Sequence, residues 1–155
     1  MANPLKKLMP SMWDHEGIWE GNYQHLDLDG NIIDQHKSRV QCIFPDDGFP
    51  DNPNVVYRQH NHFEWANGQT YDMQFDGILI DEKIYWDTAT FQGYGWSVAN
   101  NMVVLDLQRK DEPGASFQEI IVIGNDKNQR ARTWHWFKQG KCFKRTLCNE
   151  WLIQS

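Results

Sequence analysis

Apolar and polar residues alternate with a period of two over most of the chain, in ten separable segments. Turn-forming residues lie between them, for example Asn67-Gly68 and Gln139-Gly140. Successive side chains of a strand point to opposite faces, so short alternating segments with a turn about every 8–12 residues are typical of an all-β sandwich or barrel. The predicted strands span residues 18–28, 32–44, 55–65, 70–80, 83–88, 91–98, 102–109, 116–123, 130–138 and 142–153.

Tight turns join nearly all of these segments, which predicts an antiparallel meander. Closing a meander of this length on itself removes the exposed edge strands that would otherwise pair with other chains. We therefore expect an all-β fold, an antiparallel up-and-down β-barrel of about 8–10 strands, with the first and last strands adjacent.

The start of the chain breaks the alternation. Five apolar residues there follow helical spacing: Leu5, Leu8, Met9, Met12 and Trp13. Pro10 interrupts this stripe, so we expect one or two broken helical turns that plug one barrel end. The chain then divides into a helical plug over residues 1–16 and a single barrel domain over residues 17–155. The proline-rich segment 45–54 is expected to be a surface loop, or else a flap over the opposite barrel end.

The composition limits which binding partners and which cellular compartment are expected. The formal net charge is −6 and no basic run exceeds two residues, which argues against nucleic acid or an anionic membrane as a partner. No apolar stretch reaches the roughly 18 residues of a membrane span, and the first ten residues do not form a secretory signal. The odd count of three cysteines, Cys42, Cys142 and Cys148, predicts reduced thiols in a cytoplasmic protein.

Alternation also predicts which side chains face the interior. Over 55–65 and 70–80 the aromatic set is the better candidate, and it brings Gln59 and Asn61 inside with it. A packed core would have to satisfy each such polar group, so the pattern indicates a ligand cavity or a water-filled lumen. Alternation leaves open which face of 130–138 lines it. In the last strand, the set containing Arg145 is expected to point inward and Glu150 outward.

The opening Gly17-Ile18-Trp19-Glu20-Gly21-Asn22-Tyr23 resembles the first strand of lipocalin-like, or calycin-type, barrels. In that family the tryptophan plugs the closed end and a basic residue near the last strand packs over it, a position that Arg145 matches. Together with Arg132-Thr133-Trp134-His135-Trp136-Phe137 and Arg145-Thr146-Leu147, the opening is similar to an uncharacterised group of bacterial lipocalin-like domains. The resemblance implies a barrel and a cavity, and names no reaction.

The main functional hypothesis is a lumen that binds a small, largely apolar molecule, aromatic or polycyclic. Aromatic walls with a few polar anchors are the usual composition of such pockets. The predicted anchors are His25, Glu119 and Arg145. The predicted ligand-binding residues are Tyr23, Asn61, Trp65, Tyr71, Trp86, Arg132, Trp134 and His135.

Two alternatives stay open. The first is an enzyme without a cofactor, an isomerase, lyase or cyclase that uses His25, Glu119 and Arg145 for acid–base chemistry. Glu119 would then either pair with Arg132 or Arg145, or work with a raised pKa. The second is a metal or haem protein. His60-x-His62 has the spacing of two ligands on one strand, but alternation sends this face to solvent, so no metal is assigned. We expect a small-molecule partner and no cofactor, and leave a homodimer open.

Overall fold

A computed structural model describes residues 3–154, so residues 1, 2 and 155 of the predicted plug and barrel lie outside the described residues. The helices and strands are α1 (Leu5–Leu8), α2 (Pro10–Trp13), β1 (Gly17–Leu26), β2 (Ile32–Ile43), β3 (Val55–Glu64), β4 (Thr70–Ile80), β5 (Lys83–Asp87), β6 (Phe91–Ala99), β7 (Met102–Arg109), β8 (Ala115–Ile123), β9 (Gln129–Lys138) and β10 (Lys141–Gln154). The strand ends agree with the sequence prediction to within two residues.

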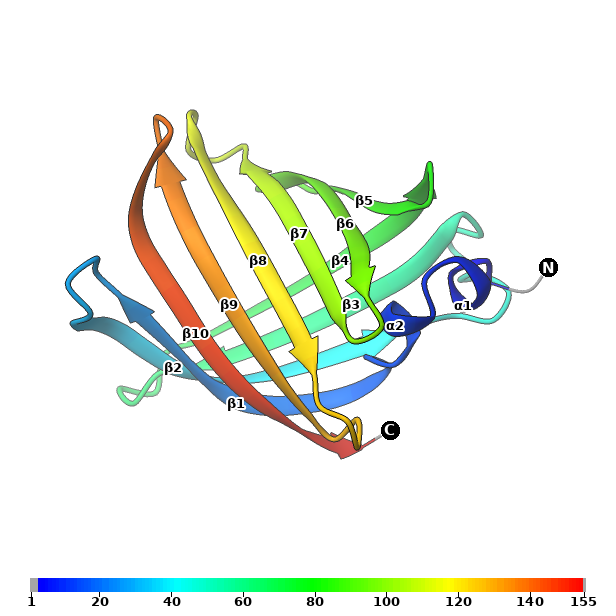
Figure 1. Cartoon of the computed structure of the whole chain (residues 1–155), viewed down its shortest axis with the longest axis horizontal. Helices are drawn as coiled ribbons and strands as arrows, with labels where there is room; N and C mark the ends of the chain where they lie inside the picture. Colours follow the sequence, from blue (N-terminus) through cyan, green and yellow to red (C-terminus); the bar gives the residue numbers. More distant parts are fainter. Residues whose placement is uncertain (1–2, 155) are drawn as a thin grey trace.

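The ten strands form one closed antiparallel barrel (Figure 1). Each strand pairs with its neighbours in the chain, and β1 pairs with β10 to close the ring. This confirms the predicted fold class and the predicted adjacency of the first and last strands. Among residues 3–154, no helix has the length and apolar character that a membrane span requires.

The two short helices close one end of the barrel, at the right of Figure 1. Leu5 and Met9 are buried in the same core as Trp19, and the two helices are the short N-terminal helical segment that the sequence predicted. The Trp19 indole N–H donates to the carbonyl of His15 at 3.0 Å. This hydrogen bond fixes the segment between α2 and β1 against the Trp19 side chain. Ser11 of α2 also hydrogen-bonds Ser97 of β6 at 2.7 Å.

The β2–β3 connection lies at this same plugged end. The amide of Asn3 donates to the carbonyls of Pro45 and Val56 at 2.8 and 2.9 Å, and the Trp13 ring packs on Phe44. The alternative of a flap over the opposite end is therefore wrong. In an up-and-down meander every second turn falls at the same end, and the β2–β3 turn shares its end with the start of β1.

The basic residue over Trp19 is Arg130 of β9, with its guanidinium carbon 4.6 Å from the ring centroid. Arg145 was expected in this place and does not occupy it. The inner face of β10 is the other one: Glu150 is buried, whereas Leu147 and Trp151 are 40% and 52% exposed. The expectations of an inward Arg145 and an outward Glu150 are both wrong.

Charge pairing explains this choice of face. Glu150 lies directly opposite Arg130 in the β9–β10 register, and its carboxylate accepts from the Arg130 guanidinium at 2.7 Å. A buried arginine without a counter-charge is strongly destabilising, whereas an exposed leucine or tryptophan costs much less. The ion pair therefore outweighs the apolar pattern of β10.

We expect Arg130→Met to lower the free energy of unfolding by about 3–5 kcal/mol, because it leaves the Glu150 carboxylate buried without its main partner. The double variant Arg130→Met, Glu150→Leu should recover most of this loss, since it removes both charges. Chemical denaturation measures both. Arg39→Met is the control: it removes an exposed pair with Glu20 and should cost less than about 1 kcal/mol. An equally small loss for Arg130→Met would contradict this account.

All three cysteines are free thiols in the structure, as predicted. Cys42 and Cys148 are buried, and burial raises the pKa of the Cys148 thiol well above its usual value. Cys142 is only partly buried.

A thiol reagent such as DTNB should therefore titrate three groups in denaturant without reductant, but only Cys142 promptly in the folded protein. The two buried thiols should react at least about 1,000-fold more slowly, because they need an opening of the barrel. Fast modification of all three thiols in the native state would contradict the burial of Cys42 and Cys148.

Candidate ligand-binding site

The barrel encloses a cavity of about 380 Å³, lined by side chains from all ten strands and from α2. This volume lies within the range of roughly 300–1,000 Å³ that is typical of small-molecule sites. The turns β1–β2, β3–β4, β5–β6, β7–β8 and β9–β10 surround the end away from the helices, which we call the mouth. Tyr71 lines the cavity near this end and is 49% exposed.

Aromatic rings form a large part of the wall. Tyr23 lies at their centre, with its ring centroid 5.1 Å from that of Phe63 and 5.2 Å from that of Trp134. Trp65 continues the wall at the mouth, and Trp86 lies deep on the far side. The Trp86 ring lies against Gly95, where an added Cβ would approach it to 2.7 Å. The indole can occupy this position because residue 95 has no side chain.

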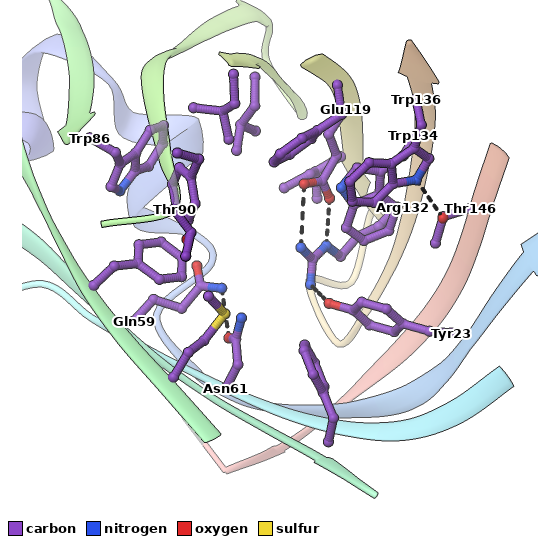
Figure 2. A pocket seen from close by; sticks show the side chains of 18 of the residues that line it. Tyr23, Gln59, Asn61, Trp86, Thr90, Glu119, Arg132, Trp134, Trp136 and Thr146 are labelled. Carbon is purple, nitrogen blue, oxygen red and sulfur yellow. Dashed lines mark hydrogen bonds and ion pairs between the residues drawn. The ribbon is translucent and has the colours of Figure 1, made fainter. Parts of the chain in front are cut away.

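A buried ion pair lies in this aromatic wall. Arg132 of β9 contacts Glu119 of β8 through two N–H groups, at 2.7 and 3.4 Å, and donates to the Tyr23 hydroxyl at 2.8 Å. Figure 2 shows Arg132 between these two partners. Burial raises the pKa of the Glu119 carboxyl, and the Arg132 guanidinium opposes that shift. The pairing of Glu119 with Arg132 is one of the two that the sequence left open.

The second ion pair lies deeper. Glu150 accepts from Arg130 and lies 3.5 Å from Arg132, so two arginines and two glutamates balance one another in the interior. Burial acts to raise the pKa of Glu150, but the two guanidinium groups hold it below its usual value. Arg130 also lies 3.2 Å from His15 Nδ1. Because arginine only donates, this nitrogen accepts and His15 is neutral; burial and both arginines lower its pKa.

A strip of polar side chains lies on the opposite wall from Arg132 (Figure 2). On β3, the Tyr57 hydroxyl donates to the Gln59 side-chain oxygen, and the Gln59 amino group donates to the Asn61 oxygen at 2.8 Å. The hydrogen bonds among residues 3–154 leave the amino group of Asn61 without an acceptor, and Asn61 lines the cavity. This strip therefore offers a donor to a molecule in the lumen.

Two imidazoles meet at the mouth. His25 Nε2 lies 3.1 Å from His36 Nε2, His25 Nδ1 lies 2.7 Å from the Thr146 hydroxyl, and His36 Nδ1 lies 3.3 Å from the Lys37 carbonyl. The carbonyl only accepts, so His36 carries its proton on Nδ1 and accepts from His25 on Nε2. Burial, with Lys144 and His36, lowers the pKa of His25 to about 4, and burial also lowers that of His36. Both rings are neutral at neutral pH.

The structure brings together most of the residues that the sequence singled out. The cavity lining includes His25, Glu119, Tyr23, Asn61, Trp65, Tyr71, Trp86, Arg132 and Trp134. Arg145 and His135 do not line it; they lie opposite one another in the β9–β10 register, on the outward-facing positions of these strands. His60 and His62 also point away from the lumen, as alternation predicted, and His62 pairs with the exposed Asp72 at 2.7 Å.

Sequence analysis missed several polar residues at or near the lining: His15, Asp34, His36, Thr90, Arg109, Asp111, Arg130, Thr146 and Glu150. Alternation over 32–43 carries the signal for His36, because His36, Ser38, Val40 and Cys42 share one face and all four are buried. Glu150 had no such signal. Its inward position depends on Arg130, which is 20 residues away in the sequence.

Several solved structures share this barrel. The S-type phycobiliprotein lyase CPES from Guillardia theta is 15% identical, with a TM-score of 0.72 over 100% of this chain and 94% of that one. A DUF3598 family protein of unknown function from Nostoc punctiforme PCC 73102 is 14% identical, with a TM-score of 0.67 over 92% of this chain and 49% of that one. Rv2717c from M. tuberculosis is 8% identical, with a TM-score of 0.60 over 94% and 97%.

No protein-family profile and no curated protein sequence matches the chain. At these identities the likeness to solved structures shows the fold alone, and the chain spans about half the length of the Nostoc protein. What the chain shares with them is the barrel, in agreement with the closed antiparallel barrel that the sequence predicted.

Proposed function

We propose that the protein binds a flat, largely apolar small molecule, aromatic or polycyclic, in the lumen of its barrel. The supporting observation is the lining itself: aromatic rings surround the cavity, and one buried ion pair, Arg132 with Glu119, lies among them. Buried aromatic rings offer large contact areas and stack on other conjugated systems. Polar groups that are fixed by their own partners orient a ligand with little reorganisation.

The positively charged side chains at the mouth favour a ligand with an acidic group. Arg109 lines the cavity there and donates to both carboxylate oxygens of Asp111 at 2.8 Å, and its guanidinium carbon lies 5.8 Å from the Trp136 ring centroid. The Lys144 ammonium lies 4.4 Å from the same ring. A conjugated ring system stacked in the lumen would carry its carboxylate to the Lys144 ammonium and to the N–H groups of Arg109 that do not bind Asp111. Charge-assisted hydrogen bonds of this kind are the strong ones.

The comparison with a phycobiliprotein lyase supports the choice of a first probe. A bilin is an open-chain conjugated tetrapyrrole with two carboxylates, and it combines the two features above. The cavity of about 380 Å³ holds part of such a molecule, and the rest extends through the mouth. We therefore place the bilin-like pigments first among aromatic ligands, and polycyclic and terpenoid compounds after them.

A second candidate is the enzyme without a cofactor, an isomerase, lyase or cyclase. His25 favours it, because this neutral imidazole lines the cavity and is oriented by Thr146. Glu119 also lines the cavity, but its bidentate contact with Arg132 makes it an anchor rather than a free acid. With Arg145 outside, the proposed acid–base set is reduced to His25.

Tryptophan fluorescence tests the binding proposal, because four of the proposed wall residues are themselves fluorophores. Biliverdin should quench the emission saturably with one molecule per chain. Arg109→Met should weaken this binding by about 10- to 150-fold, the equivalent of a lost charged hydrogen bond of about 1.5–3 kcal/mol. The matched control is Arg145→Met, which removes an arginine outside the lumen and should leave the affinity unchanged.

Equal losses for the two variants would contradict the proposed orientation. No saturable quenching with biliverdin or with a panel of polycyclic aromatic and terpenoid compounds would contradict the binding function itself. Loss of a chemical activity on replacement of His25, with binding retained, would instead favour the enzyme.

A further inference from the structure

Three side chains of the metal-ligating kind meet at the mouth of the cavity. They are His25 on β1 with Asp34 and His36 on β2, and one ligand atom from each lies within 4.8 Å of the other two. The strand register produces this cluster, since His25 lies directly opposite Asp34, and His36 follows on the same face of β2. All three line the cavity.

The separation of the two imidazoles suits a shared ion. Two nitrogen ligands at about 2.0–2.1 Å from one ion lie about 2.9 Å apart at a right angle and about 3.3 Å apart at the tetrahedral angle. The His25 and His36 Nε2 atoms are 3.1 Å apart, between these two values. An ion can therefore lie between them with little movement of either ring, once the His25 ring proton has moved from Nε2 to Nδ1.

Each of the three ligands has a neighbour that can serve as its outer partner in a metal site. Histidine ligands usually donate their second ring N–H to an oxygen. The His36 Nδ1–H already donates to the Lys37 carbonyl, and His25, with its proton on Nδ1, would donate to the Thr146 hydroxyl. The Asp34 carboxylate accepts from the Trp65 indole N–H at 3.1 Å, so it too is oriented.

We propose that His25, Asp34 and His36 bind a divalent transition-metal ion at the mouth of the barrel, with zinc as the first candidate. Two imidazoles and one carboxylate are a donor set for zinc or iron, and three protein ligands leave a coordination position open. The site faces the lumen, so that position is within reach of a bound molecule. Both rings are neutral at neutral pH, the form that ligates metal.

Metal-stripped protein without an affinity tag tests this site by titration with Zn²⁺ in a calorimeter and with Co²⁺ in an absorption spectrometer. We expect one ion per chain, and Co²⁺ bands in the visible region typical of nitrogen and oxygen ligands. His36→Gln and Asp34→Asn should each weaken binding by at least about 100-fold, more than the loss of an outer partner. Circular dichroism confirms that the variants are folded.

The matched control is His62→Gln. It removes an imidazole from the exposed His62–Asp72 pair, on the outward face that the sequence pattern pointed to, and should leave the affinity unchanged. Absence of saturable binding, or binding that survives both His36→Gln and Asp34→Asn, would overturn the proposal, as would binding lost only in His62→Gln. The titration needs no lumen ligand, so its result is independent of the proposed function.

Discussion

The arrangement of the barrel interior depends on four buried charges, those of Arg130, Arg132, Glu119 and Glu150. Each arginine contacts one glutamate at 2.7 Å, and all four side chains are almost fully buried. A single unpaired charge in this position would cost several kcal/mol, a large part of the stability of a domain of this size. Strands β8, β9 and β10 must therefore pair in a register that keeps all four together.

This constraint determines which side chains reach the lumen. A shift of one residue in β9 would turn Arg130, Arg132 and Trp134 to solvent. The observed register instead places Trp134 and Trp136 on the cavity wall beside the ion pairs. It also leaves Leu147 and Trp151 on the outer face of β10, where they are exposed. The same pairs stabilise the fold and give the wall its polarity, so stability and ligand recognition depend on one set of residues.

Much of the fold could be predicted because it depends on the local pattern of apolar, polar and turn-forming residues. Alternation and turn residues located all ten strands, and alternation alone placed Asn61 on the cavity wall and His62 outside. Burial of Trp19 followed from the resemblance of the first strand to known barrels. These features need only neighbouring residues or one short motif.

The errors fall where distant residues decide. The apolar set of β10, with Leu147 and Trp151, predicted that Arg145 points inward, because a hydrophobicity pattern does not contain the charge on the facing strand. Arg130 takes the place over Trp19 for the same reason. The cluster of His25, Asp34 and His36 needs the β1–β2 register, which the predicted strand ends alone do not fix.

The central claim is that a flat aromatic molecule occupies the lumen beside the Arg132–Glu119 pair. The indole N–H signals of the eight tryptophans, recorded by ¹⁵N–¹H NMR with and without biliverdin, test it most directly. Trp65, Trp86, Trp134 and Trp136 line the cavity, and their signals should shift. The signals of Trp96 and Trp151, which do not line it, should stay in place. Shifts at Trp96 or Trp151, with the four lumen signals unchanged, would contradict this account.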